Sequence, residues 1–244
     1  MSGHSKWATT KHKKEAVDKK RGTLFTKLGN AVAIATRQGS DPEMNFSLRL
    51  AIDRAKAANV PKENIERAIK KGSGEVEGSQ LEEIIYEGFG PGKISIIIET
   101  LTDNKNRTVA EIKHILDKSG GTLGGQGSVM WQFEQKGCLS IMLSSAKEKL
   151  NCSNNEEIEL KLIDFNIDDV KFNNDQILIY TKPENLQQTK KDLEKIDIKI
   201  NSVDISFIPK EKQTTDDETK EKIQSLFDTL DEHPDVVNYY TNLI

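Results

Sequence analysis

The chain has 244 residues, of which 35% are hydrophobic and 30% are charged, and its formal net charge is −4. This length and apolar content are enough for buried cores in one to three domains. No stretch approaches the roughly 18 consecutive apolar residues of a membrane span, and the opening Met-Ser-Gly-His-Ser-Lys-Trp lacks the apolar run of a signal peptide, so we expect a cytoplasmic protein.

The first 27 residues, here called the basic head, carry a positive charge that the rest of the chain does not share. They contain eight Lys and Arg against Glu15 and Asp18, a surplus of +6. Residues 1–75 hold 16 Lys and Arg against 8 Asp and Glu, a surplus of +8, whereas residues 76–244 hold 19 against 31, a balance of −12. Because affinity for phosphate depends on where cations gather, this asymmetry predicts a polyanionic partner.

Aromatic and imidazole side chains are interleaved with these cations. Trp7 and two histidines suit stacking and phosphate contact, whereas a solvated charge run, the alternative interpretation, has no need of them. A helix beginning near Thr23 would hold the cations on an ordered base. We therefore predict nucleic-acid contacts from the following set: His4, Ser5, Lys6, Trp7, Lys11, His12, Lys13, Lys14, Lys19, Lys20, Arg21 and Lys27.

Three short amphipathic helices are predicted next. Leu24, Phe25, Leu28, Ala31, Val32 and Ala35 follow helical spacing up to a stop at Gly39. A second helix is expected from about Ser47 to Ala58, and a third from Pro61 to Gly72. None can bury its apolar stripe alone, so the three should pack together with most of their cations outside. The segment 72–80 then has the composition of a linker.

The hydrophobic period changes after this linker. Strands are expected at Ile84–Tyr86 and Ile94–Glu99, joined by a glycine-rich turn, and a helix at Asp103–Gly120 with Thr108 and Glu111 at capping-box spacing. A glycine-rich loop should then lead to a strand at Val129–Phe133.

The remaining pattern predicts a second α+β unit. Residues 137–207 have the order strand, helix, strand, strand, helix, strand, which is that of the ferredoxin-like fold. A final helix and the strand Val236–Tyr240 are too few elements for a domain, so they should return to the sheet begun near residue 81. The predicted class is α+β with three domains: 1–78, a basic helical domain; 79–134 plus 208–244, a discontinuous α+β domain; and 135–207, an inserted ferredoxin-like domain.

No motif for catalysis, metal or cofactor binding emerges. The segment Gly-Gly-Thr-Leu-Gly-Gly-Gln-Gly-Ser lacks the lysine of a phosphate-binding loop and precedes a strand, so a tight turn is favoured. Cys138 and Cys152 have no ligand spacing and are interpreted as ordinary thiols. His114 and His233 are expected to be surface or phosphate-contacting residues and not ligands or catalytic bases. The late acidic residues are interpreted as a solvated face that repels nucleic acid: Asp216, Asp217, Glu218, Asp231, Glu232 and Asp235.

Several motifs together resemble one known family. They are GHSKWATTKHKK, DKKRGTLFTKL, NVPKENIERAIKKGSGE, YEGFGPGK, ETLTDNKNRTVAEIKHILDKSGGTLG, GSVMWQF and SLFDTLDEHPDVVNYYTN. In this order they are similar to the YebC family of probable transcriptional regulators, a group that includes the mitochondrial translational activator of cytochrome oxidase. The resemblance implies three domains, the third inserted in the second, and no enzymatic activity. It also implies either sequence-selective DNA binding or a ribosome-associated role at proline-rich stretches.

Three functional hypotheses follow. The first is a nucleic-acid-binding regulator that binds DNA through the basic head. The second is a translation factor that binds the phosphates of ribosomal RNA through the same residues. The third is an enzyme, which is the weakest because no nucleophile or base is evident. Neither a membrane nor a small-molecule substrate is expected as a partner. The absence of helix-turn-helix, zinc-finger and RNA-recognition signatures leaves DNA and ribosomal RNA as equal partners for the same cations.

Overall fold

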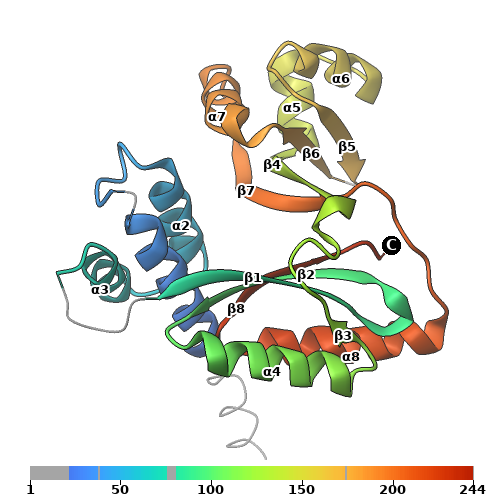
Figure 1. The fold of residues 1–244 in the computed structure, drawn as a ribbon. Coiled ribbons are helices and arrows are strands. Elements are labelled where there is room, and N and C mark those ends of the chain that lie inside the picture. Colours follow the sequence, from blue (N-terminus) through green and yellow to red (C-terminus); the bar gives the residue numbers. More distant parts are fainter. Residues whose placement is uncertain (1–21, 38, 76–80, 174, 244) are drawn as a thin grey trace, which may run out of the picture. The chain divides into compact units, whose positions relative to one another are not determined.

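The computed structural model describes residues 22–37, 39–75, 81–173 and 175–243 (Figure 1). The basic head up to Arg21 and the predicted linker residues 76–80 lie outside the described residues. The described residues divide into two compact units, one formed by those up to Met130 together with those from Lys212 onward, and the other by Trp131–Glu211. The α+β class predicted from the sequence is confirmed. The residue limits of the three predicted domains stay a prediction.

Three helices begin the first unit, as predicted. The first helix covers residues 22–36, α2 is Phe46–Ala57 and α3 is Lys62–Gly72. Their inward stripes share one core with Leu81 and Leu101 next to the sheet; its buried helical members include Val32, Leu48, Ile52, Ala55, Ile65 and Ala68. This shared core follows from the amphipathic spacing.

Asn45 joins the first helix to α2 through one buried side chain. Its Oδ1 accepts from the Leu48 backbone N–H as the N-cap of α2, while its Nδ2 donates to the carbonyls of Ala35 and Gly39, both at 2.7 Å. The amide therefore supplies hydrogen-bond partners to backbone carbonyls at the end of the first helix and to a backbone N–H at the start of α2, groups that lack partners within their own helices.

Gly72 lies at the end of α3, against the first helix. A Cβ there would lie 2.0 Å from the Ala33 carbonyl oxygen and 2.7 Å from Thr36 Cβ. We expect Gly72→Ala to lower the free energy of unfolding by about 2–3 kcal/mol, because the two helices must move apart. Urea unfolding measures this. Gly22→Ala is the control, since no described atom lies within 4 Å of that added Cβ. Equal stability of the Gly72 variant and the wild type would contradict the close approach.

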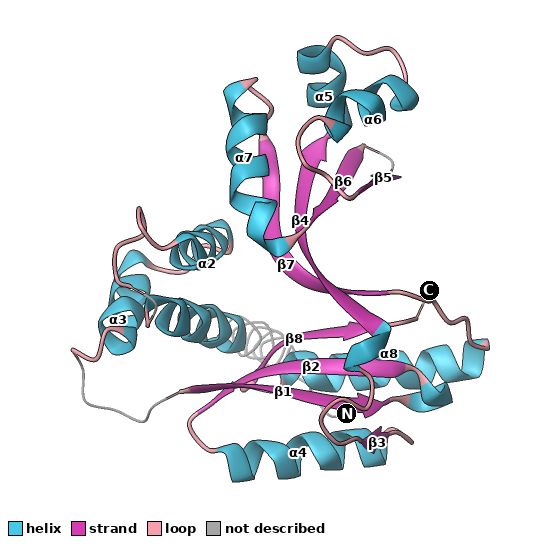
Figure 2. Ribbon diagram, turned by 45° about the horizontal axis from the view of Figure 1, so that its top comes forward, coloured by secondary structure: helices cyan, strands magenta, loops and turns pink. Residues whose placement is uncertain are grey.

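The sheet of the first unit has the strand order β3-β1-β2-β8 and is antiparallel throughout. Its β2–β8 pairing confirms that the C-terminal strand returns to this sheet. Figures 1 and 2 show α4 and α8 side by side on one face, where their apolar side chains pack on Tyr86, Ile96 and Ile98. The elements are β1 Glu82–Phe89, η1 Pro91–Lys93, β2 Ser95–Thr102, α4 Lys105–Lys118, β3 Thr122–Leu123, α8 Asp217–Glu232 and β8 Val236–Thr241.

Two local predictions in this unit are wrong. The N-cap of α4 is Asn104, whose side chain accepts from the Arg107 N–H, so Thr108 and Glu111 do not form a capping box. The strand predicted at Val129–Phe133 is also wrong, because Met130–Gln132 forms the short 3₁₀ helix η2 and a strand starts only at Phe133. The edge strand next to β1 is Thr122–Leu123. The cap of α4 is decided locally by Asn104, whereas the loop is fixed by Glu87, about 40 residues earlier in the sequence.

Glu87 holds the glycine-rich loop against the sheet. Its side chain is 5% exposed and lies on the strand face opposite to that of Tyr86. Oε1 accepts from the Gly127 N–H at 2.6 Å, and Oε2 accepts from Val129 and Met130 at 2.8 and 2.7 Å. Val129 is fully buried at the same place. The loop is therefore a tight, anchored turn, as the glycine content indicated.

The second unit contains a four-stranded antiparallel sheet of order β5-β6-β4-β7. This order is that of the ferredoxin-like fold and confirms the pattern predicted for residues 137–207. Helix α5 is not among the predicted elements, although Leu143, Ala146 and Leu150 have helical spacing. The elements are β4 Phe133–Met142, α5 Leu143–Leu150, α6 Asn155–Ile163, β5 Asp169–Asn173, β6 Gln176–Thr181, η3 Pro183–Asn185, α7 Leu186–Lys195 and β7 Ile200–Pro209.

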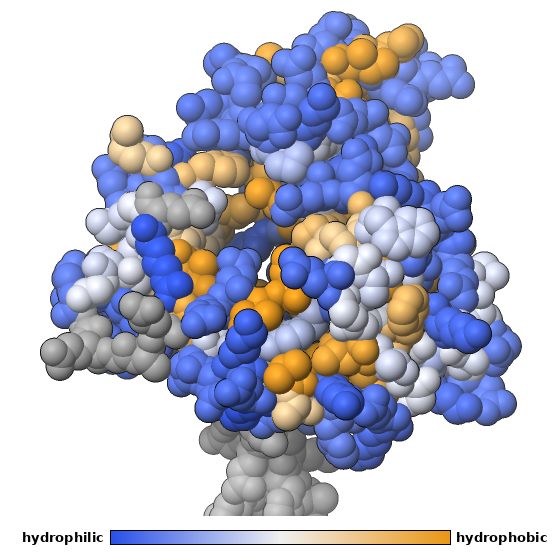
Figure 3. Space-filling model, viewed as in Figure 1, coloured by the Kyte–Doolittle hydropathy of each residue, from blue (hydrophilic) through white to orange (hydrophobic). Residues whose placement is uncertain are grey.

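The core of the second unit is built from cross-strand pairs. Leu139 faces Ile179 and Ile141 faces Ile177 across β4 and β6, and all four side chains are at most 1% exposed. On α6, by contrast, Leu160 and Ile163 are 69% and 56% exposed among the mainly hydrophilic surface that Figure 3 shows.

Candidate nucleic-acid interface

Lys27 is the member of the predicted contact set that falls within the described residues. Its half-buried ammonium donates to the carbonyl oxygens of Leu230 and Asp231, at 3.4 and 3.0 Å. Burial lowers the pKa of Lys27, although the nearby Asp231 acts in the opposite direction. The ammonium thus ties the first helix to the C-terminal end of α8, where cations are favoured. The other eleven residues, from His4 to Arg21, lie outside the described residues, and phosphate contact by any of the twelve stays a prediction.

The three-helix part of the first unit carries several exposed cations. The side chains of Arg67 and Lys71 form no ion pair with another residue in the described part of the chain. Both are exposed, and their spacing of four residues places them on one face of α3. Arg54 is half-buried, in contrast to the other cations predicted to lie outside: Arg37, Lys56, Arg67, Lys70 and Lys71.

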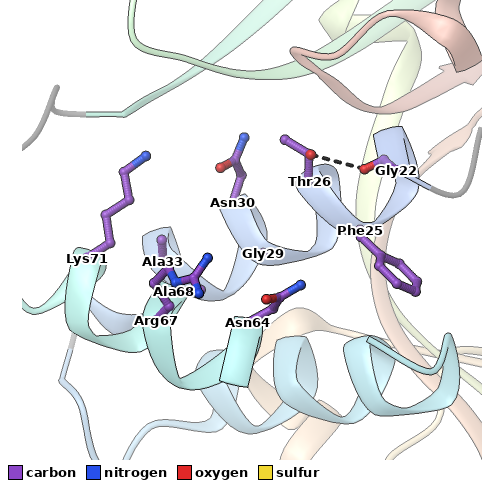
Figure 4. A pocket seen from close by; sticks show the side chains of 10 residues that line it. All are labelled: Gly22, Phe25, Thr26, Gly29, Asn30, Ala33, Asn64, Arg67, Ala68 and Lys71. Atoms are coloured by element: carbon purple, nitrogen blue, oxygen red, sulfur yellow. Dashed lines mark hydrogen bonds between the residues drawn. The ribbon is translucent and has the colours of Figure 1, made fainter. Parts of the chain in front are cut away.

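A groove of about 380 Å³ runs between the first helix and α3. Figure 4 shows Lys71 and Asn30 projecting to the same side, with Arg67 and Asn64 between the two helices. The lining from the first helix is Gly22, Phe25, Thr26, Gly29, Asn30 and Ala33; that from α3 is Asn64, Arg67, Ala68 and Lys71. On each helix these positions recur every three or four residues, so each set shares one face.

This groove joins two kinds of polar group. Arg67 and Lys71 supply cations, while the Asn30 and Asn64 amides each offer both hydrogen-bond donors and an acceptor. The two asparagines were missed by the sequence analysis. One feature of the sequence pointed to this face of the first helix: Gly29 is an isolated glycine inside a helical pattern, and such a glycine usually has a packing or functional role.

A second polar cluster lies where α4 meets the turn between α8 and β8. Asp235 Oδ2 accepts from Arg107 Nη2 at 2.8 Å and from Thr108 Oγ1 at 2.7 Å. His233 Nε2 lies 3.0 Å from Glu111 Oε2, and His233 Nδ1 accepts the Asp235 backbone N–H. His233 and Asp235 are 8% and 7% exposed, so the predicted surface position of both residues is wrong.

This cluster is a structural junction and a poor cation site. Carboxylate and imidazole atoms of Glu111, His233 and Asp235 lie within 4.8 Å of one another. However, Nδ1 of His233 already accepts the Asp235 N–H, Nε2 is occupied by its contact with Glu111, and the Arg107 guanidinium repels any added cation. The cluster therefore joins α4 to the start of β8.

The two thiols are also poor candidates for chemistry. Cys152 is buried, and Cys138 is half-buried in β4. Burial raises the pKa of the Cys138 thiol, which disfavours the nucleophilic thiolate.

Within the described residues, no helix is long and apolar enough to cross a bilayer.

Comparison with known proteins finds two family models that match successive parts of the chain. Residues 5–75 match the TACO1/YebC protein N-terminal domain, and residues 81–243 match the TACO1/YebC second and third domain. A protein of Caldanaerobacter subterraneus named a probable transcriptional regulatory protein is 46% identical over 244 residues, which cover 100% of this chain and 98% of that protein. A protein with the same description from Thermoanaerobacter pseudethanolicus is also 46% identical and is covered to 97%.

A solved structure has the same fold. The crystal structure of a conserved hypothetical protein from Aquifex aeolicus matches with a TM-score of 0.79 and 42% sequence identity. The match covers 92% of this chain and 90% of that one.

Proposed function

Because this chain belongs to the TACO1/YebC family, we propose that it is a non-enzymatic, cytoplasmic regulator of gene expression that binds DNA. The observation that carries this proposal is the separation of charge along the chain. Residues 1–75 have a surplus of +8 and residues 76–244 a balance of −12. This separation of charge attracts a phosphate backbone to residues 1–75 and repels it from the acidic remainder of the chain.

Arg67 and Lys71, which are exposed on one face of α3, extend this basic region into the described part of the chain. Their exposed guanidinium and ammonium groups can reach phosphate, a contact that sets position on the nucleic acid without reading sequence. The names of the relatives support a regulatory role. The basic head supplies the rest of the charge, with Lys13 and Lys14 near its centre.

Salt dependence of binding tests this proposal. If five cations contact duplex DNA, the logarithm of the association constant should fall against the logarithm of salt concentration with a slope of roughly −4 to −5. Reversing both Lys13 and Lys14 to Glu should weaken binding at low salt and flatten that slope. Fluorescence anisotropy with a labelled duplex measures both quantities.

The matched control reverses two exposed lysines of the second unit, Lys147 and Lys149, to Glu. It makes the same change in net charge and should leave binding within about twofold. Equal weakening by both pairs would show that net charge alone governs binding and would contradict the role of the basic head. Cosedimentation with ribosomes, without binding to duplex DNA, would favour the translation factor, because the same cations can contact ribosomal RNA.

A further inference from the structure

Gly29 is a glycine in the middle of the first helix that no described neighbour requires. Glycine inside a helix is less stable than alanine by about 1 kcal/mol, so its presence usually has a packing reason. Gly72 has one, since a Cβ there would meet the Ala33 carbonyl. At Gly29 no atom of the described chain lies within 4 Å of an added Cβ. The missing side chain instead leaves the floor of the groove open.

The groups around this floor match the chemistry of a nucleotide. Arg67 and Lys71 are cations on one face of α3, suited to a phosphate. The amides of Asn30 and Asn64 combine donor and acceptor, the pair that matches the edge of a base. Since a phosphate only accepts hydrogen bonds, the two asparagines are better explained by a base or sugar than by the phosphate alone.

The size and shape of the groove favour an unpaired nucleotide. Its volume of about 380 Å³ falls in the range of roughly 300–1,000 Å³ that is typical of small-molecule sites. A base within an intact duplex is stacked and cannot enter a hollow between two helices. An unstacked base in a loop, bulge or single strand can do so.

We propose that the groove between the first helix and α3 binds one unpaired nucleotide of a nucleic acid. Arg67 and Lys71 hold the phosphate, Asn30 and Asn64 hydrogen-bond the base or sugar, and Gly29 allows the nucleotide to approach the helix backbone. This inference rests on the proposed nucleic-acid binding and adds a site within it. DNA and RNA both contain the phosphate, sugar and base that these side chains would contact, so both nucleic acids are tested.

The experiment measures binding of the full-length protein to labelled single-stranded RNA, single-stranded DNA and duplex DNA of equal length. Replacing both Arg67 and Lys71 by Ala should weaken single-strand binding by tenfold or more and duplex binding by less. The control replaces Lys62 and Lys70 by Ala, which removes the same charge from exposed positions of α3 that do not line the groove. It should change both affinities by no more than threefold. Of single-stranded RNA and single-stranded DNA, the one that binds with higher affinity identifies which nucleic acid supplies the nucleotide.

Gly29→Leu tests the groove without changing charge. Leucine is a good helix former, its Cβ meets no described atom outside its own helix, and the groove of about 380 Å³ has room for the rest of its side chain, so the variant should melt no lower than the wild type. It should nevertheless weaken single-strand binding at least fivefold. Should it fold poorly, the double alanine variants keep the test valid.

Two outcomes would overturn the site while leaving the proposed function intact. One is equal weakening by both double alanine variants, and the other is unchanged single-strand affinity of a folded Gly29→Leu protein. Failure of the wild-type protein to bind any of the three nucleic acids would instead overturn the proposed function, and the nucleotide site with it.

Discussion

Glu87→Ala is expected to lower the free energy of unfolding by about 4 kcal/mol. The change removes the acceptor of three backbone N–H groups, at Gly127, Val129 and Met130, and leaves them without a partner next to a buried side chain. Each hydrogen bond to a charged group contributes roughly 1.5–3 kcal/mol, and some of the loss is regained as the loop opens to water. Urea unfolding followed by circular dichroism measures the change.

Glu83→Ala is the matched control for this variant. Glu83 lies on the same face of β1 but is exposed, so its removal should change stability by no more than about 0.5 kcal/mol. Similar unfolding midpoints for the two variants would contradict the anchoring role of Glu87.

The pH dependence of stability gives a second check on Glu87. Burial by itself would raise the pKa of the carboxyl group, but the three backbone hydrogen bonds outweigh it and hold the pKa below 4.5. A carboxyl with a lowered pKa in the folded state stabilises the protein above its unfolded pKa. That contribution is lost as pH falls through the folded pKa. The wild type should therefore lose more stability than Glu87→Gln between neutral and strongly acidic pH.

Asp235→Ala is expected to lower the free energy of unfolding by about 3 kcal/mol. Removing one partner of a buried, hydrogen-bonded ion pair typically costs about 3–5 kcal/mol. The lower end of this range applies here because the Arg107 side chain is 45% exposed and can be hydrated once Asp235 is removed. Thr108 also loses its carboxylate acceptor. Chemical unfolding at pH 7 measures the change, with the exposed Asp117→Ala on α4 as control.

Acid pH should reduce the difference between the wild type and Asp235→Asn. Burial would raise the pKa of Asp235, but hydrogen bonds from Arg107 and Thr108 hold it below 3.8. The stabilisation is therefore complete above the unfolded pKa of about 3.9 and is lost as pH falls through the folded value. A difference that stays constant from pH 7 to strongly acidic pH would show that the charge of Asp235 does not stabilise the junction.

The sequence predicted the elements whose cause is local. The apolar stripe from Leu24 to Ala35 can be followed without knowing any other part of the chain, and the first helix covers it. The ferredoxin-like order was also predictable, because alternation and helical spacing each leave a distinct period. Of the candidate site, the sequence predicted the basic head and most of the exposed cations on the three helices.

Other features needed the folded chain. The predicted capping box at Thr108 failed because α4 begins earlier, with Asn104 as its N-cap, and Thr108 lies inside the helix. Its hydroxyl instead donates to Asp235, 127 positions away in the sequence. His233 was expected at the surface because it precedes Pro234 in a turn, yet packing against α4 buries it. The strand predicted near Val129 failed for the same kind of reason, because Glu87 fixes that backbone from another strand.

The sequence by itself thus determined the period of each helix and strand and the separation of charge, because both are properties of neighbouring residues. Tertiary structure alone decided which carboxylates are buried, and it brought Gly29 and Asn30 opposite Arg67 to form the groove. Such juxtapositions depend on how apolar faces distant in sequence pack, and a one-dimensional pattern contains no distance between them.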